Sequence, residues 1–253
     1  MAFPMASGTS RSDRVSETRR AILTAAERLF AEQGVVAVSS RQISEAAGQG
    51  NNTAVGYHFG DKAGLVRAIV SRHADQIDVL RTRMLAEIGD STDVRDWCSC
   101  LVRPGTEHLA ALDGASWYAR FAAQIMTDPT LRASMLDEVL GRPSLQRALD
   151  GLKQCLPTLP PQVLVLRAGM ARLLLVHSLA ERERTLAEDT RTATVSWSEH
   201  TTALVDALVG LWLAPATPAV EGTADAFLAM TRTPEGTATA RGCPDAVPSR
   251  MPS

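Results

Sequence analysis

Hydrogen-bonding side chains are concentrated in one short stretch of the chain, QGNNTAVGYHFGDK. An asparagine amide can pair bidentately with adenine, and a threonine can meet a thymine methyl group or a phosphate. Tyrosine and histidine can donate hydrogen bonds to phosphate oxygens. These residue types, set so close together, favour contact with DNA. The candidates in this stretch are Gln49, Asn51, Asn52, Thr53, Tyr57 and His58.

Two short helices are expected to position these side chains. Ser39 followed by Gln42 matches a capping box, so one helix should begin there and run until a glycine ends it. The next helix, capped by Asn51 or Asn52, should reach Phe59. Two short helices joined by a turn that contains glycine form the helix-turn-helix arrangement, whose second helix lies in the DNA major groove.

The flanks of this pair add further candidates for DNA contact. Val55 and Phe59 lie four residues apart and should share the inward face of the second short helix, which leaves a polar face outward. Arg41 belongs to the first helix of the pair, which crosses the phosphate backbone, although a plain surface arginine is the alternative. Lys62 stands in the first turn of the following helix, beside amides that favour an anion. Ser39, at the start of the first helix, is the remaining candidate for contact with DNA.

Composition predicts an all-α protein. Of the 253 residues, 45% are hydrophobic and 4% aromatic, and the abundance of alanine, leucine, arginine and glutamate favours helices over sheets. A net charge of −2 gives no global attraction to a polyanion, so a nucleic-acid site must be local. Four cysteines are too few for a disulfide framework. Without a signal segment or a spanning run of about 20 apolar residues, we expect a cytoplasmic protein with no membrane partner.

The chain divides into parts by pattern and composition. The amino-terminal end is small and polar, and structure should begin near Ser16. Within the larger part a helix break is expected at Pro104–Gly105. The predicted parts are a flexible arm (1–15), a helix-turn-helix domain (16–62), a linking helix (61–88), a larger helical domain (63–214) and a mostly disordered tail (215–253).

No motif in the sequence supplies enzymatic chemistry. The five histidines never fall at H-x-x-x-H or H-E-x-x-H spacing, which argues against a metal site. No G-x-S-x-G, P-loop or G-x-G-x-x-G motif occurs. We therefore expect no catalytic residue, no metal and no cofactor, and an enzyme is the least favoured class of function.

Two long segments, 163–188 and 195–213, are apolar over more of their circumference than a one-sided surface helix needs. Two such helices from each subunit could close a four-helix interface. A two-fold dimer would present its reading helices to half-sites one turn of DNA apart. The sequence thus predicts a homodimer, with two buried helices of a monomer as the alternative.

Three blocks of the sequence, AILTAAERLFAEQG, SSRQISEAAG and YHFGDKAGLVRAIV, resemble the amino-terminal domain of the TetR (tetracycline repressor) family of bacterial transcriptional regulators. The resemblance covers about residues 16 to 72. It implies a three-helix DNA-binding domain and a larger helical domain for ligand binding and dimerisation. It also implies a homodimer that usually represses from a palindromic operator until a small molecule binds.

The sequence departs from the family pattern in the turn and in the second short helix. The turn Gly48–Asn51 is one residue longer than the usual family turn, and Gly56 stands where the family typically has tyrosine. Tyr57 could supply the phosphate contact one position later. Together with the low net charge, these departures motivate an alternative function: a helical small-molecule-binding or scaffold protein that does not read DNA.

An aromatic cluster in the larger domain has two interpretations of similar weight. Packing is the ordinary one, and a pocket for a small apolar or aromatic effector is the other, because pockets between helices have such linings. A ligand there could tilt the linking helix 61–88 and change the separation of the reading helices. His177 could instead be a core or interface residue. The ligand-binding candidates are Trp97, Trp117, Tyr118, Arg120, Phe121, Met126 and His177.

Overall fold

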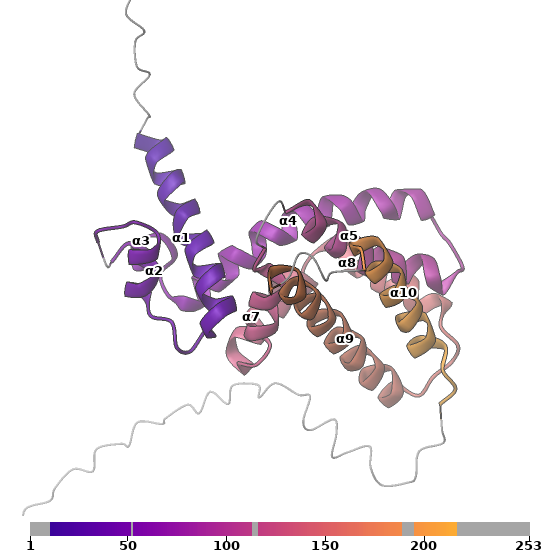
Figure 1. The fold of residues 1–253 in the computed structure, drawn as a ribbon. Coiled ribbons are helices and arrows are strands. Elements are labelled where there is room, and N and C mark those ends of the chain that lie inside the picture. Colours follow the sequence, from indigo (N-terminus) through magenta and orange to yellow (C-terminus); the bar gives the residue numbers. More distant parts are fainter. Residues whose placement is uncertain (1–10, 52, 113–115, 189–194, 217–253) are drawn as a thin grey trace, which may run out of the picture. The chain divides into compact units, whose positions relative to one another are not determined.

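The computed structural model describes residues 11–51, 53–112, 116–188 and 195–216, which form ten α-helices and no strand (Figure 1). The all-α prediction is confirmed for these residues. The helices are α1 (Arg11–Gln33), α2 (Ser40–Ala46), α3 (Ala54–Phe59), α4 (Lys62–Ile88), α5 (Val94–Ala111), α6 (Tyr118–Ile125), α7 (Pro129–Leu140), α8 (Pro143–Cys155), α9 (Pro161–Glu188) and α10 (Trp197–Leu213).

The first helix begins earlier than predicted. α1 starts at Arg11, so residues 11–15 are helical although the sequence suggested an arm that reached residue 15. Asp13 lies in the first turn, where a carboxylate interacts favourably with the helix dipole. Our predictions for residues 1–10 and for residues 217–253 of the tail lie outside the described residues.

Helix α5 continues through Pro104, where the sequence predicted a break. Proline has no N–H to donate to the carbonyl four residues earlier, which here belongs to Cys100. The buried Arg81 of α4 supplies a replacement donor, since its Nε lies 3.2 Å from the Cys100 carbonyl oxygen. A hydrogen bond from a neighbouring helix therefore satisfies the carbonyl that the proline leaves free.

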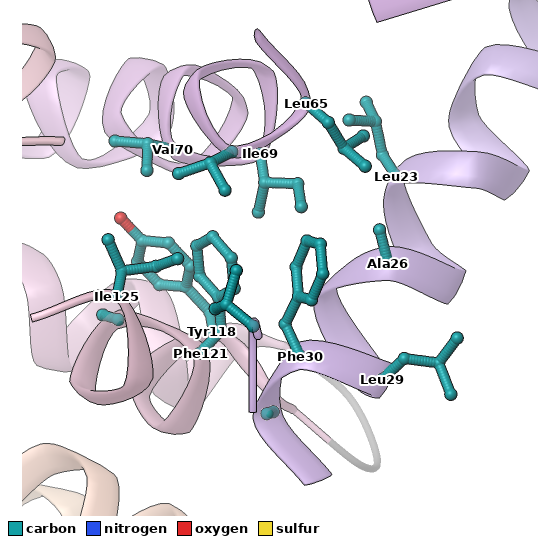
Figure 2. Close-up of a cluster of buried hydrophobic side chains, with 14 of the residues drawn as sticks. Leu23, Ala26, Leu29, Phe30, Leu65, Ile69, Val70, Tyr118, Phe121 and Ile125 are labelled. Atoms are coloured by element: carbon teal, nitrogen blue, oxygen red, sulfur yellow. The ribbon is translucent and has the colours of Figure 1, made fainter. Parts of the chain in front are cut away.

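One hydrophobic cluster joins the helix-turn-helix segment to the larger helical part. Figure 2 shows Phe30 of α1 facing Phe121 of α6, with Ile69 of α4 reaching toward them. The Phe30 and Phe121 rings are stacked with their centroids 6.2 Å apart, and both side chains are fully buried. The packing is therefore continuous across the predicted domain boundary at residues 62 and 63.

A second hydrophobic cluster lies farther along α4 and is built mainly from α5, α8 and α10. Trp97, Cys98, Leu208 and Trp212 are buried in it, together with Leu85 near the end of α4. Because α4 has 27 residues, its length is about 40 Å at 1.5 Å per residue. This helix begins at the helix-turn-helix segment and contributes to both clusters.

Candidate functional site

The cap of α2 has the geometry that the sequence predicted. The Ser39 hydroxyl oxygen accepts from the Gln42 amide at 3.3 Å, and Gln42 Oε1 accepts from the Ser39 amide at 2.9 Å. These reciprocal bonds complete a capping box. Ile43 of α2 and Val55 of α3 are buried in the first cluster. Both short helices are thus fastened by one face.

The turn before α3 is organised by Asn51, which the sequence predicts as a candidate cap of this helix. Asn51 Oδ1 accepts from the Thr53 amide at 3.0 Å and from the Thr53 hydroxyl at 2.7 Å. Such an Asx turn mimics a backbone turn, and the helix begins after it, at Ala54, rather than at the predicted asparagine. Gly48 has φ +69°, a left-handed conformation that suits glycine. Asn52 lies outside the described residues.

The outward face of α3 is polar and open to solvent. Tyr57 is 82% exposed, and the half-buried His58 ring meets it edge-on with centroids 5.0 Å apart. Thr53 and Gly56 are also exposed. Since Val55 points into the core, α3 is held by its inner face while these side chains can approach bases and phosphates.

Arg41 of α2 is also placed for phosphate contact. Its Nε lies 2.8 Å from Glu45 Oε1, and the hydrogen bond to this carboxylate raises the pKa of Arg41 above its ordinary value. Both partners are exposed, and such pairs are weak, so the guanidinium remains available to a phosphate. Two other predicted DNA contacts also make local hydrogen bonds. Gln49 Nε2 donates to the Ala47 carbonyl at 3.2 Å, and Ser39 is the N-cap residue of α2.

Lys62 has a structural role that differs from the predicted phosphate contact. Its Nζ donates to the Val35 carbonyl at 2.8 Å and to the Val38 carbonyl at 3.0 Å, in the segment between α1 and α2. The ammonium group satisfies two backbone acceptors that would otherwise lack these donors. Lys62 therefore fastens the start of α4 to this segment. Its ammonium group has a third N–H, so the phosphate contact of Lys62 stays a prediction.

Sequence reasoning missed a contact that holds the end of α3. The guanidinium carbon of Arg19, on α1, lies 4.9 Å from the centroid of the Phe59 ring. A cation over an aromatic face at this distance is attracted by the electron-rich ring. The helical spacing of α1 gave no sign of this partner, which lies 40 residues away in the sequence.

The aromatic ligand candidates are divided between the two hydrophobic clusters. Trp97 lies in the second cluster, where its Nε1 donates to the Ser91 carbonyl at 2.9 Å and its ring packs tightly on Gly151. The prediction of one aromatic pocket is therefore wrong, because α5 and α6 bury these rings in different places. The candidates in or against the first cluster are Trp117, Tyr118, Phe121 and Met126.

Arg120 is half-buried and forms an ion pair with a buried carboxylate. Its Nε lies 3.1 Å from Glu183 Oε2, on α9. The same carboxylate accepts from the Ser116 hydroxyl at 2.6 Å and from the Ala119 and Arg120 amides at 3.2 and 2.9 Å. These amides open α6, where unpaired N–H groups favour a negative charge. Glu183 thus caps α6 from another helix.

A cavity of about 770 Å³ opens beside Trp97, between the segment that follows α4 and helix α8. Its lining combines the indole of Trp97 with the carboxylates of Asp90 and Asp150 and the guanidinium of Arg147. Its size lies within the range of small-molecule sites. The mixed lining suits a ring compound that also carries polar groups.

Helix α9 carries an exposed apolar stripe. Met170, Leu173 and Leu174 are exposed, and His177 lies exposed on the same face at the spacing of one helical side. His177 is therefore outside both buried clusters, as its interpretation as an interface residue requires. By length and composition, α9 is also the helix among the described residues that could cross a membrane.

Comparison with known proteins identifies the family. The family model for bacterial regulatory proteins of the tetR family matches residues 22–69, and that for the tetracyclin repressor-like C-terminal domain matches residues 99–210. The HTH-type transcriptional repressor AcnR of Corynebacterium glutamicum is 30% identical over an alignment of 145 residues, and the match covers 54% of this chain and 69% of AcnR. AcnR of Corynebacterium efficiens is 31% identical over 144 residues, with the same coverage.

A solved structure agrees with this fold. The fatty acid degradation regulator FadR from Bacillus halodurans superposes with a TM-score of 0.50 at 18% identity, over 76% of this chain and 95% of that one. Proteins of the matched family generally act by binding DNA rather than by catalysis. With its helix-turn-helix geometry and both family matches, the chain belongs to the TetR family and is a DNA-binding transcriptional regulator.

Proposed function

We propose that this regulator is a cytoplasmic homodimeric repressor that binds a palindromic operator and is released from it by a small molecule. The observation that carries the proposal is the open polar face of α3, fastened from behind by Val55 and by the contact between Arg19 and Phe59. A short helix held in this way can enter the major groove without rearranging its supports. Repression is the activity named for the two related AcnR proteins.

Individual roles follow from position and exposure. Tyr57 and His58 are assigned to phosphates or base edges, and Thr53 to a thymine methyl or a phosphate. Arg41 is assigned to the phosphate backbone that α2 crosses. The remaining proposed contacts come from Gln49, Asn51, Asn52 and Ser39, of which Asn51 also shapes the turn.

The proposed dimer interface is built on the exposed apolar stripe of α9. Met170, Leu173 and Leu174 would lose their water contact there, which stabilises association. α10 buries Leu204, Leu208 and Trp212 within the subunit but exposes Ala203 and Ala207, whose small size allows a close approach of another helix. This arrangement explains the apolar length of α9 without a membrane.

The proposed effector site is the cavity beside Trp97. Asp90 in its wall comes two residues after the end of α4, while α4 begins next to the reading helix at Lys62. A compound that displaces this wall would move one end of a rigid helix and so change the separation of the two reading helices in the dimer. Coupling requires that the compound binds the two arrangements with different affinity. An aromatic compound with polar substituents fits the lining.

The test of DNA reading is a footprint on fragments that tile the protein's own coding region. We expect protection of two symmetric half-sites whose centres lie about 34 Å apart. Tyr57→Ala should weaken this footprint at least tenfold, whereas Val79→Ala, which alters an exposed side chain of α4, should not. Equal footprints for both variants, or no protected site, would contradict the proposal.

The effector site has a separate test. Phenols and aromatic acids are added to the operator complex, and the compound that releases the DNA is then assayed with two variants. Arg147→Ala in the cavity should reduce the response and leave operator affinity unchanged, while Arg132→Ala on the exposed surface of α7 should respond as the wild type does. An unaltered response of Arg147→Ala would place the effector elsewhere.

A further inference from the structure

A chain of buried polar side chains crosses from the DNA-reading part of the molecule into the larger helical part. Glu27 Oε2 of α1 lies 2.9 Å from His73 Nε2 of α4, and His73 Nδ1 lies 2.8 Å from His108 Nε2 of α5. The Tyr118 ring of α6 stacks on His73 with centroids 3.8 Å apart. These four side chains are all at least nine-tenths buried. The proposed contacts with DNA and effector leave this chain without a role.

The hydrogen-bond partners assign the protons. Glu27 also accepts from Arg72 at 2.5 Å, so the carboxylate is ionised and His73 Nε2 must donate to it. A neutral His73 then offers Nδ1 as an acceptor, which His108 Nε2–H fills. One carboxylate, one guanidinium and two neutral imidazoles give no net charge. Arg72 Nη2 also lies 3.2 Å from His73 Nε2, and in this assignment both nitrogens direct an N–H to Glu27 Oε2.

An additional proton disturbs this balance. It can enter at His108 Nδ1. The proton between His108 Nε2 and His73 Nδ1 can then move to His73, which becomes an imidazolium beside Arg72. The guanidinium and the imidazolium then share one buried carboxylate, that of Glu27. Burial, repulsion from a protonated His73 and the charge of Arg72 lower the pKa of His108 to about 4, although Glu27 opposes the shift. Burial raises the pKa of Tyr118, which stays neutral. The charge of Arg142 acts on Tyr118 in the opposite direction and lowers the pKa of this phenol.

We propose that these linked polar side chains make operator binding sensitive to proton concentration. A proton taken up by the histidine pair separates α1 from α5 and α6, and this separation lowers the affinity for the operator. The proposal rests on the proposed function as an operator-binding repressor. It adds the proton as a second effector, at a site distinct from the cavity beside Trp97.

The packing of α1 explains why separation would reach the DNA. Glu27 lies one turn before Phe30, which stacks on Phe121 of α6, and α2 packs directly on α1. While the polar side chains keep their hydrogen bonds, these contacts hold α1, and α2 with it, in one orientation relative to α6. Fixed orientation favours binding because less conformational freedom is lost in the complex. A loosened α1 must be ordered again at each binding event.

Proton linkage gives the size and the sign of the effect. In the separated arrangement His108 is hydrated and regains its ordinary pKa near 6.5, whereas in the intact arrangement protonation is suppressed. Acid therefore favours separation, by up to about tenfold for each pH unit below 6.5.

The test compares three proteins at pH 7.5 and pH 5.5 and constant ionic strength, using fluorescence anisotropy with the operator duplex. His108→Gln keeps an N–H donor for His73 but cannot take up the proton. His200→Gln is the matched control, since His200 is a half-buried histidine of α10 bonded to Ser178. Between pH 7.5 and pH 5.5 we expect the operator Kd of the wild type and of the control to rise about three- to tenfold more than the Kd of His108→Gln.

Equal pH profiles for the wild type and His108→Gln would overturn the proposal. If the wild type binds no operator at pH 7.5, the proposed function fails. The proton-linked separation of α1 is then tested on the DNA-free protein, by imidazole ¹⁵N NMR and by amide protection. Joint titration of His73 and His108 with loss of amide protection in α1 would support it. Retained protection in α1 down to pH 5 would refute it.

Discussion

Gly64 offers the sharpest test of the junction between the reading helix and α4. A Cβ at this position would lie 2.1 Å from the backbone carbonyl oxygen of Phe59, the last residue of α3. The Gly64 amide also donates to Asp61 Oδ1 at 2.7 Å, so the first turn of α4 is fixed where it stands. Gly64→Ala must therefore push the end of α3 away from α4 or break this cap.

The expected cost has two opposing parts. Alanine is favoured over glycine in a helix by about 1 kcal/mol. Overpacking against an immovable neighbour costs about 1–3 kcal/mol or more, and at 2.1 Å from a backbone atom the upper end applies. We expect a net loss near 2 kcal/mol, which for a chain of this size lowers the melting temperature by about 4–8 °C. Operator affinity should fall with it, because α3 moves.

Gly56→Ala is the matched control, because no atom lies within 4 Å of a Cβ at that position. It should stabilise α3 by up to about 1 kcal/mol. Thermal unfolding followed by circular dichroism measures both variants, and fluorescence anisotropy measures their operator binding. Equal melting temperatures for Gly64→Ala and the wild type would refute the contact at the junction.

Three further predictions concern the larger helical part. Leu173→Glu should shift the protein from a dimer to a 27.1 kDa monomer in sedimentation, because a carboxylate would enter the apolar α9 stripe; a persisting dimer would exclude this interface. Glu183→Gln should lower the free energy of unfolding in urea by about 1.5–3 kcal/mol, since the half-buried Arg120 guanidinium loses its counter-charge, and a loss below about 1 kcal/mol would contradict the pair. Arg81→Met should cost about 1–3 kcal/mol by orphaning the Cys100 carbonyl. In a Pro104→Ala background, Arg81→Met should cost clearly less, because the amide of Ala at position 104 can donate to the Cys100 carbonyl. Equal costs in both backgrounds would refute the idea that Arg81 replaces the missing proline amide.

Local sequence signals predicted the ends of several helices correctly. The Ser39–Gln42 capping box and the Asp61 cap both involve partners within three residues, so the motif contains the whole interaction. Gly89 likewise ends α4 where predicted. The inward position of Val55 followed from helical period alone. Such features depend on neighbours in the chain and need no knowledge of the fold.

The errors arose where a distant partner decides the outcome. α5 continues through Pro104, and Arg81 of α4 bonds to the Cys100 carbonyl that the proline leaves free. Trp97 and Phe121 are close in the sequence but are buried in different clusters. No spacing rule contains these contacts, because they follow from how the helices pack.

The central claim is that the chain reads DNA through α3, and the salt dependence of operator binding tests it most directly. Affinity for the footprinted duplex and for a scrambled duplex is measured by fluorescence anisotropy across a series of salt concentrations. The account predicts that the footprinted duplex binds more tightly and that affinity falls steeply, with a slope of about −0.9 in the logarithmic plot for each phosphate neutralised. Binding that is indifferent to both salt and sequence would contradict it.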